Sequence, residues 1–356
     1  MSKNSNPLGG FSASKVILPV IIGLSVVAFM VVREFDPEVF GKLTFGWWSA
    51  LFILVALLCM AGRDFGYMIR IRALSDWELN WRQAFNIIML WEFTSAVTPS
   101  SIGGTSVATV YIHKEGLTVG RSSAIVMVTS LLDEFYFVIM FPLIVLLVGT
   151  DALFDIPDSP GWSHGIIATA LIGYSIKFVW VIALGYGLFF NPRGLSKLIY
   201  GIFHLPVLRR WKRAAGKAAL DIISSAKEMK SKNAKYWFDA IISTFLSWTS
   251  RYWVVNFMFL AFFAVPEHFL IFARQLVMWL ILLVSPTPGG SGVAEFTFSI
   301  FLGGYIPIAG LAIALALLWR LISYYPYLII GVIMAPNWFN TKFKKSKKNN
   351  SNLKNG

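Results

Sequence analysis

The stretch Val284-Ser-Pro-Thr-Pro-Gly-Gly-Ser-Gly-Val-Ala-Glu295 places two prolines, three glycines and a carboxylate inside a region that is otherwise almost wholly apolar. Proline removes a backbone donor and glycine loosens the backbone, so both interrupt a helix. At membrane depth such a break is tolerated only where protein or a water-filled cavity satisfies the freed polar groups. A related stretch, Val97-Thr-Pro-Ser-Ser-Ile-Gly-Gly-Thr-Ser-Val107, lies earlier in the chain. Two interrupted apolar segments in corresponding halves are typical of a transport site.

The composition indicates a membrane protein. Of the 356 residues, 56% are hydrophobic and only 14% are charged, whereas a soluble domain carries roughly 25% charged residues. Apolar runs of about 20 residues, the length that spans a bilayer, recur from end to end. These runs are continuous and do not alternate, which argues against a β-barrel. We therefore predict an all-α polytopic membrane protein.

Several function classes are disfavoured by the residues that the chain uses. The single cysteine, Cys59, rules out an internal disulfide and a cysteine-based metal cluster. The net charge of +13 is expected to face anionic lipid rather than nucleic acid, because basic residues collect beside the apolar runs. Gly289-Gly-Ser-Gly292 lacks the Gly-Lys-Ser/Thr ending of a nucleotide-binding loop. We expect no cofactor, no metal and no catalytic group.

The distribution of lysine and arginine predicts the orientation of the spans. The basic segment 193–235, the tail and the loop 70–82 are assigned to the cytoplasm, and the acidic loops 34–38 and 151–158 to the outside. About six full spans are expected, over residues 15–33, 45–69, 122–148, 166–190, 237–263 and 306–334. The charge pattern then requires the short apolar pieces around each Pro/Gly stretch to enter the membrane and return to the side from which they came. The alternative is that each pair of pieces forms one kinked span.

The two halves, about 45–150 and 236–335, then share one plan: a span, a re-entrant helical hairpin and a span, in opposite directions. This is an inverted-topology repeat, a common layout of secondary transporters. We predict one transmembrane domain over residues 1–335 and a disordered basic cytoplasmic tail over 336–356. The segment 193–235 is either an amphipathic helix on the inner leaflet or a solvated loop.

Ionisable side chains inside the apolar runs are the candidates for a site, because each costs about 2.5–3.5 kcal/mol to insert. Two readings of Arg251 and Arg320 stay open: an anion site for a lipid phosphate, which guanidinium groups suit, or structural pairing with carboxylates. Lys177 either snorkels to the interface or lines the path. The hairpin tips either only turn the chain or present amides to an anion. The candidate substrate-binding residues are Arg251, Arg320, Glu295, Asp133, Glu134, Glu92, Thr98, Pro99, Gly103, Gly104, Pro286, Pro288, Gly289, Gly290 and Tyr324.

Three stretches, Thr98-Pro-Ser-Ser-Ile-Gly-Gly104, Pro286-Thr-Pro-Gly-Gly-Ser-Gly-Val-Ala-Glu295 and Leu318-Trp-Arg-Leu-Ile-Ser-Tyr324, resemble the lysylphosphatidylglycerol synthase transmembrane-region family, also called flippase-like. In its best-known member, the multiple peptide resistance factor, a membrane flippase domain precedes a soluble domain that transfers lysine from aminoacyl-tRNA to phosphatidylglycerol. Here only a short basic tail follows Met334, so we expect the flippase domain without the synthase domain. A basic residue often follows the first glycine pair in the family, but Thr105-Ser-Val-Ala-Thr109 stands here.

The resemblance implies a flippase-like transporter in the bacterial inner membrane, with both termini in the cytoplasm. Its substrate would be an anionic phospholipid or a polyprenyl-phosphate-linked lipid. An alternative is a membrane subunit of, or an enzyme in, lipid aminoacylation or lipid-linked glycosyl transfer, which would need a cytosolic transferase partner. A scaffold that only binds anionic lipid is a third reading. Assembly into a homodimer is left open.

Overall fold

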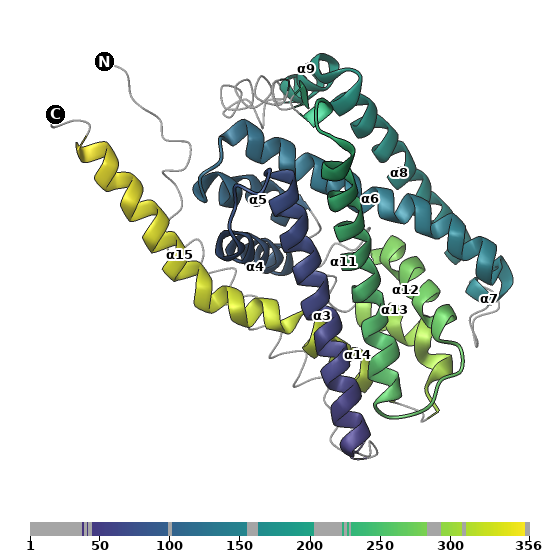
Figure 1. Cartoon of the computed structure of the whole chain (residues 1–356). Coiled ribbons are helices and arrows are strands. Elements are labelled where there is room, and N and C mark those ends of the chain that lie inside the picture. Colours follow the sequence, from purple (N-terminus) through teal and green to yellow (C-terminus); the bar gives the residue numbers. More distant parts are fainter. Residues whose placement is uncertain are drawn as a thin grey trace.

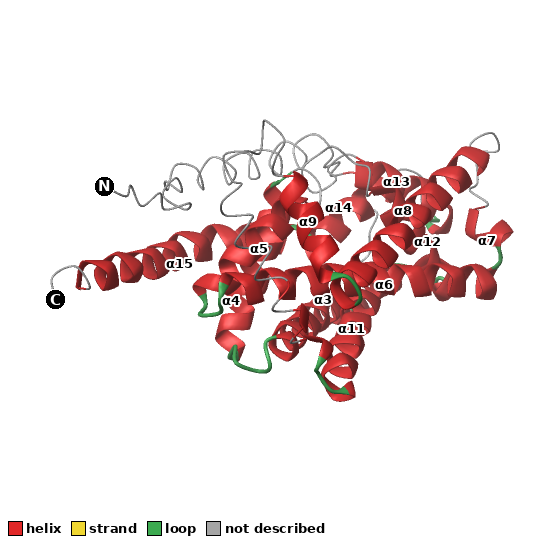
Figure 2. Cartoon of the chain, turned by 90° about the horizontal axis from the view of Figure 1, so that it is seen from above, coloured by secondary structure: helices red, strands yellow, loops and turns green. Residues whose placement is uncertain are grey.

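The computed structural model contains helices and no strand in the residues that it describes (Figures 1 and 2), which are 38, 41, 45–98, 102–154, 163–202, 223, 226–227, 229–282, 293–307 and 311–352. The all-α prediction is confirmed for these ranges. The elements are α3 (Trp47–Leu74), α4 (Trp81–Val97), α5 (Ile102–Lys114), α6 (Val119–Val148), α7 (Thr150–Phe154), α8 (Ser163–Phe189), α9 (Pro192–Ile202), α11 (Ala234–Leu260), α12 (His268–Leu282), α13 (Val293–Leu302), η2 (Gly303–Tyr305), α14 (Leu311–Ser323) and α15 (Tyr325–Asn352).

Within the described residues, four helical segments are long and apolar enough to cross a membrane: Trp47–Leu74, Val119–Val148, Ile167–Phe189 and Leu311–Phe339. They correspond to four of the six predicted spans. The fifth, α11, has 27 residues, enough to span a bilayer, but its serine, threonine, asparagine and arginine side chains lower its hydropathy. The first predicted span, 15–33, lies outside the described residues.

Local sequence explains where several helices begin. Asn80 and Gln83 form a capping box at the start of α4: each side chain accepts the backbone N–H of the other, both at 2.9 Å. Two of the otherwise unsatisfied donors of a helix start are thereby bonded. Asn233 caps α11 by accepting the N–H of Tyr236 at 3.0 Å. At its far end α6 stops at Gly149, whose φ of +83° suits glycine.

Helices α3 and α11 form the closely packed central pair of the molecule (Figure 1). The Tyr236 hydroxyl donates to Leu74 O at 3.2 Å, and Arg70 Nη1 donates to Thr244 Oγ1 at 3.2 Å. Further along, Gly62 lies beside Ser250. Residue numbers therefore rise along one helix as they fall along the other, so the two helices run antiparallel.

Close approach of α3 and α11 depends on Gly66. Gly62 and Gly66 lie four residues apart and therefore on one face of α3. In membrane proteins, small residues on a helix face allow two helix backbones to approach closely. A Cβ on Gly66 would lie 2.3 Å from Ser247 Oγ and 2.8 Å from Ser243 O. We expect Gly66→Val to lower the free energy of unfolding by about 1–3 kcal/mol through overpacking.

Thermal stability of the purified protein, followed by size-exclusion chromatography after heating, measures this effect. Gly62→Ala is the matched control, because a Cβ there would meet Ser250 Oγ at an ordinary 3.5 Å. Equal stability of the two variants would contradict the role given to Gly66.

Helices α4 and α5 form a hairpin whose two ends lie at the same face of the molecule. Near the start of α4, Gln83 Nε2 donates to Glu115 O, just past the end of α5, at 2.7 Å. Arg121 in the first turn of α6 donates to Ser75 O, just past the end of α3, at 3.1 Å. The ends of α3 and α5 and the starts of α4 and α6 therefore meet at one face.

Helices α12 and α13 form a second hairpin with its ends at the opposite face. Arg274 of α12 donates to Phe301 O, near the end of α13, at 3.1 Å and to Ala152 O in α7 at 2.9 Å. Since α7 follows the far end of α6, this contact lies at the face opposite the starts of α4 and α6. The order α3, α4, α5, α6 thus recurs, roughly 190 residues later and in the reverse direction, as α11, α12, α13 and α14–α15.

The predicted last span is broken into two helices. α14 ends at Ser323 and α15 begins at Tyr325. Pro326 explains the break, because proline lacks an N–H and disfavours helical backbone in the residue before it. The Tyr324 hydroxyl at the break donates to Ala96 O, near the end of α4, at 2.8 Å.

The tail that we predicted to be disordered from residue 336 differs in the structure, where α15 continues as a helix to Asn352 and extends beyond the other helices (Figures 1 and 2). Trp338 Nε1 donates to Glu115 Oε1 at 2.5 Å, and Lys342 Nζ to Oε2 at 2.6 Å. Glu115 is buried and requires such partners. The prediction used only the basic composition of the tail, which does not indicate that Glu115, far away in the sequence, binds this helix. In the segment 193–235, α9 is helical to Ile202, and residues 203–222 lie outside the described residues.

Candidate functional site

A cavity of about 310 Å³ lies between the first set of helices, α3 to α6, and the second set, α11 to α15. The end of α4, through Ser95 and Ala96, and the facing ends of α12 and α13, through Leu282 and Ala294, all line it. The described ends of α4, α12 and α13 therefore lie at this space. The charged side chains in its wall are Arg63, Arg70, Glu92, Asp133, Glu134, Lys177, Arg251 and Arg320.

Arg320 and Glu295 form a buried ion pair in the second set of helices. Arg320 Nε donates to Glu295 Oε1 at 2.8 Å, and both residues are 5% exposed. The first turn of α13 holds Glu295 and the last turn of α14 holds Arg320. Arg320 Nη2 is buried and has no hydrogen-bond partner among the described residues. A buried donor left in this way is costly, so this atom is suited to an incoming acceptor.

Asp133 and Glu134, neighbours on α6, each pair with a different cation. Asp133 accepts Arg70 Nη1 at 2.5 Å and Trp248 Nε1 at 2.7 Å. Glu134 forms an ion pair with Lys177 of α8. Lys177, for which the sequence left two readings open, lines the cavity, and its side chain is only 3% exposed.

Arg63 holds two carboxylates at once. It contacts Glu92 Oε2 at 2.6 Å and Asp64 Oδ1 at 2.9 Å, and its side chain is 2% exposed. The Tyr327 hydroxyl, from α15, accepts from Arg63 Nη1 at 2.8 Å and donates to Asp64 at 2.8–2.9 Å. Glu92 in turn faces the cavity. This cluster joins α3, α4 and α15.

Arg251 differs from every other cation in the cavity wall. Within the described ranges it makes no ion pair and no hydrogen bond, while the other four cations each contact a carboxylate. Its guanidinium carbon lies 4.6 Å from the ring centroid of Trp279 and 5.6 Å from that of Trp248. Such stacking stabilises the cation and leaves its N–H donors available to a ligand.

The structure brings together seven of the residues predicted for the site. Six line the cavity, and Glu295 pairs with one of them: Arg251, Arg320, Glu92, Asp133, Glu134, Tyr324 and Glu295. Arg320 pairs with Glu295, one of the carboxylates considered for it, whereas Arg251 contacts no carboxylate in the described residues.

The remaining predicted residues belong to the hairpin tips. Thr98 follows the end of α4, and its hydroxyl donates to Thr94 O at 2.6 Å. Gly103 and Gly104 lie in α5; a Cβ on Gly104 would lie 1.8 Å from Ser95 Oγ, so glycine allows the two arms to touch. The other five lie outside the described residues: Pro99, Pro286, Pro288, Gly289 and Gly290.

Sequence reasoning missed the cluster on α3. Arg63 and Asp64 lie inside a predicted span, so the rule that selected Asp133 and Glu134 selects them equally. Arg70 was assigned to a cytoplasmic loop, but it lies in the last third of α3 and is 4% exposed. Tyr327 gave no signal, because a tyrosine in an apolar run is ordinarily part of the packing or of an interfacial belt.

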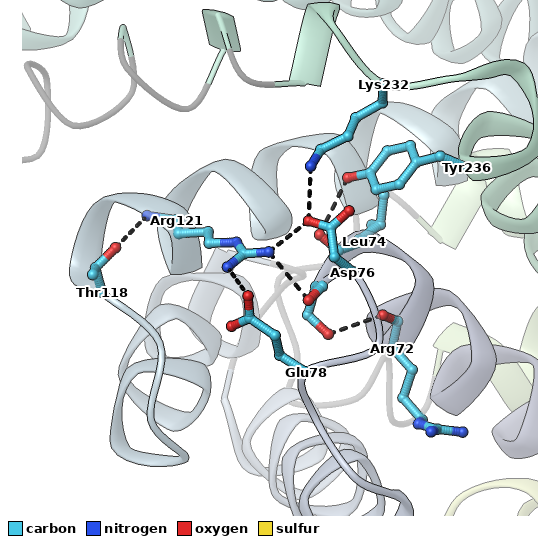
Figure 3. A network of polar contacts seen from close by, with 9 residues as sticks. Arg72, Leu74, Asp76, Glu78, Thr118, Arg121, Lys232 and Tyr236 are labelled. Atoms are coloured by element: carbon cyan, nitrogen blue, oxygen red, sulfur yellow. Dashed lines mark hydrogen bonds and ion pairs between the residues drawn. The ribbon is translucent and has the colours of Figure 1, made fainter.

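A second polar cluster lies at the face where α3 ends and α6 and α11 begin (Figure 3). Arg121 contacts Asp76 and Glu78, each at 2.6 Å, and Lys232 contacts Asp76 at 2.9 Å. The loop that carries Asp76 has left-handed backbone at Asp76 and Trp77, with φ of 53° and 62°. The cluster links the first set of helices to the start of the second.

The fold and the cavity define a polytopic helical membrane protein with a charged interior site. Residues 16–331 match the model of the family described as the lysylphosphatidylglycerol synthase TM region. The chain belongs to this family, which confirms the resemblance noted from its motifs. It is also similar to a UPF0104 membrane protein of Archaeoglobus fulgidus, with 26% identity over 312 residues that cover 83% of this chain and 90% of the relative.

Proposed function

We propose that the protein is a flippase-like transporter that carries the anionic headgroup of a phospholipid, or of a lipid-linked phosphate, between the leaflets of the membrane. The observation that carries this proposal is Arg251, a cation in the cavity wall with no carboxylate partner among the described residues. A cation that lies among membrane helices without a counter-ion favours an anionic ligand.

The cavity supplies donors for a phosphate group. Besides Arg251, the buried Arg320 Nη2 and Thr129 Oγ1 lack hydrogen-bond partners in the described part of the chain, and both residues line the space. Guanidinium groups match phosphate oxygens in charge and geometry. A volume of about 310 Å³ is at the lower end of ligand pockets, so a headgroup fits while acyl chains stay in the lipid.

Helix lengths support re-entrant hairpins. α4, α5, α12 and α13 have 17, 13, 15 and 10 residues, fewer than the about 20 needed to span a bilayer. Each hairpin therefore enters and returns on one side, and the two sets of helices form an inverted repeat. Rocking of one set against the other would expose the cavity to each leaflet in turn. We place the face with Arg121, Lys232 and Lys342 in the cytoplasm, because basic residues gather there.

Reconstitution into liposomes tests the proposal. Fluorescent phosphatidylglycerol in the outer leaflet is quenched by dithionite, and its protection after inward movement is measured over time. We expect movement faster than in protein-free liposomes, and faster for phosphatidylglycerol than for zwitterionic phosphatidylcholine with the same label. Equal rates with and without protein would contradict a lipid transporter.

The alternative is a membrane part of an enzyme that aminoacylates or glycosylates a lipid. It requires a transferase partner, so the two functions separate in a purified system. Lipid movement by the protein alone supports transport. Movement that appears only after addition of a cytosolic extract with aminoacyl-tRNA or nucleotide sugar supports the enzyme subunit.

A further inference from the structure

Basic and acidic side chains are equal in number around the cavity. Five cations line it, and five carboxylates either line it or pair with those cations, within the residues that the structure describes. Three ion pairs are one to one. The remaining charges are distributed unevenly, since Arg63 holds both Asp64 and Glu92 while Arg251 contacts no carboxylate. Arg63 therefore has two carboxylate partners for one positive charge, whereas Arg251 has none among the described residues.

A phosphate group that binds at Arg251 would disturb this balance. It would bring at least one negative charge into a space that already contains as many carboxylates as cations, and uncompensated charge is costly in a medium of low dielectric constant. Neutrality is restored most simply if one carboxylate gains a proton. The two carboxylates that share Arg63 are the ones for which this costs least, because protonation of either leaves Arg63 paired with the other.

We propose that the Asp64–Glu92 pair takes up one proton from bulk water when an anionic headgroup enters, so that anion and proton occupy the cavity together. This inference rests on the proposed function and adds the ion that accompanies the substrate. One carboxylate oxygen gains the proton, and Arg63 keeps an ion pair throughout. Both carboxylates contact the same guanidinium group, so the proton is assigned to the pair and not to one member of it.

The groups around the pair fit this role. Arg63 and the Tyr327 hydroxyl contact the pair directly, and Arg63 also lies over the ring of Tyr67. Arg251 on α11 and Asp133 on α6 line the same cavity. Tyr327 keeps Asp64 hydrogen-bonded at both oxygens. Glu92 lines the cavity, so one member of the pair faces the space that the headgroup would enter. Glu295 is a less suitable group for the proton, because it already forms an ion pair with Arg320.

Proton uptake during binding is the direct test. The full-length protein in detergent, in weak buffer with a pH-sensitive dye, is titrated with short-chain phosphatidylglycerol, and the affinity is measured by tryptophan fluorescence at several pH values. We expect uptake of about one proton per bound lipid. Binding linked to one proton weakens by up to about tenfold per unit rise in pH. In Asp64→Asn and Glu92→Gln we expect the uptake to disappear and the affinity to become independent of pH.

Asp151→Asn is the matched control, because Asp151 is an exposed carboxylate on α7, outside the cavity wall. The Asp151→Asn variant should take up as many protons per bound lipid as the wild type does. If Asp64→Asn fails to fold, Glu92→Gln and the conservative Glu92→Asp, which should retain uptake, decide the matter. Binding by the wild type without proton uptake, or unchanged uptake in Glu92→Gln, would overturn this inference alone. Absence of any binding by the wild type would overturn the proposed function and this inference with it.

Discussion

Arg251→Ala is expected to slow the movement of anionic lipid by about 10- to 100-fold. The reason is that charge-assisted hydrogen bonds contribute about 1.5–3 kcal/mol each, and no carboxylate among the described residues occupies the donors of Arg251. Its removal leaves no buried carboxylate without a partner in the described residues, so the fold should be little affected. The lost stacking on Trp279 accounts for a change in stability of about 1 kcal/mol or less.

The dithionite assay in liposomes measures the rate, and a thermal melt of the same samples separates transport from folding. Arg251→Lys should restore part of the rate, because it keeps the charge but loses the planar fork. Arg193→Ala serves as the matched control, since Arg193 is exposed on α9, away from the cavity wall. A rate equal to that of the wild type in Arg251→Ala would refute the anion site.

Glu295→Gln is expected to destabilise the protein by about 3–5 kcal/mol, because the loss of one partner leaves a buried charge uncompensated. Arg320 is 5% exposed and has no second ion pair among the described residues. Replacement of both partners by apolar residues of similar size, in Glu295→Leu with Arg320→Met, should recover most of this loss. Transport should stay impaired in the double variant, since a donor to the phosphate is gone.

Equilibrium unfolding in mixed micelles gives the stabilities, and the liposome assay gives the rates. The comparison of the single with the double variant separates the two roles of Arg320. A double variant as unstable as Glu295→Gln would show that the pair is needed for folding in its own right. Full transport by the double variant would remove Arg320 from the site.

Much of the architecture could be predicted from the positions of lysine and arginine. The charge pattern alone required two hairpins that enter from opposite sides, and the bonds of Gln83 and Arg274 place the hairpin ends at opposite faces. The helical architecture was predictable because loop charge and span length depend on the membrane rather than on packing details. Re-entry into a bilayer stays a proposal.

The site was predicted in part, because a sequence shows which charges are buried but not how they pair. Arg251 and Arg320 gave the same signal, yet Arg320 meets Glu295 while Arg251 lies over two indole rings. Pairing depends on which helix faces meet. The break at Tyr324 was missed because the flanking residues are apolar enough for one continuous span, and only Pro326 marks it.

We propose that the cluster of Arg121, Asp76, Glu78 and Lys232 in Figure 3 restrains the movement of the two sets of helices in the proposed transporter. Its side chains are 18–54% exposed, so dissolved ions weaken it within a Debye length of about 8–10 Å. Movement of one helix set against the other must break the contact between Lys232 and Asp76. We therefore expect lipid movement to accelerate as salt rises from about 0.05 to 0.5 M, and Asp76→Asn to show a flatter salt dependence with a higher starting rate.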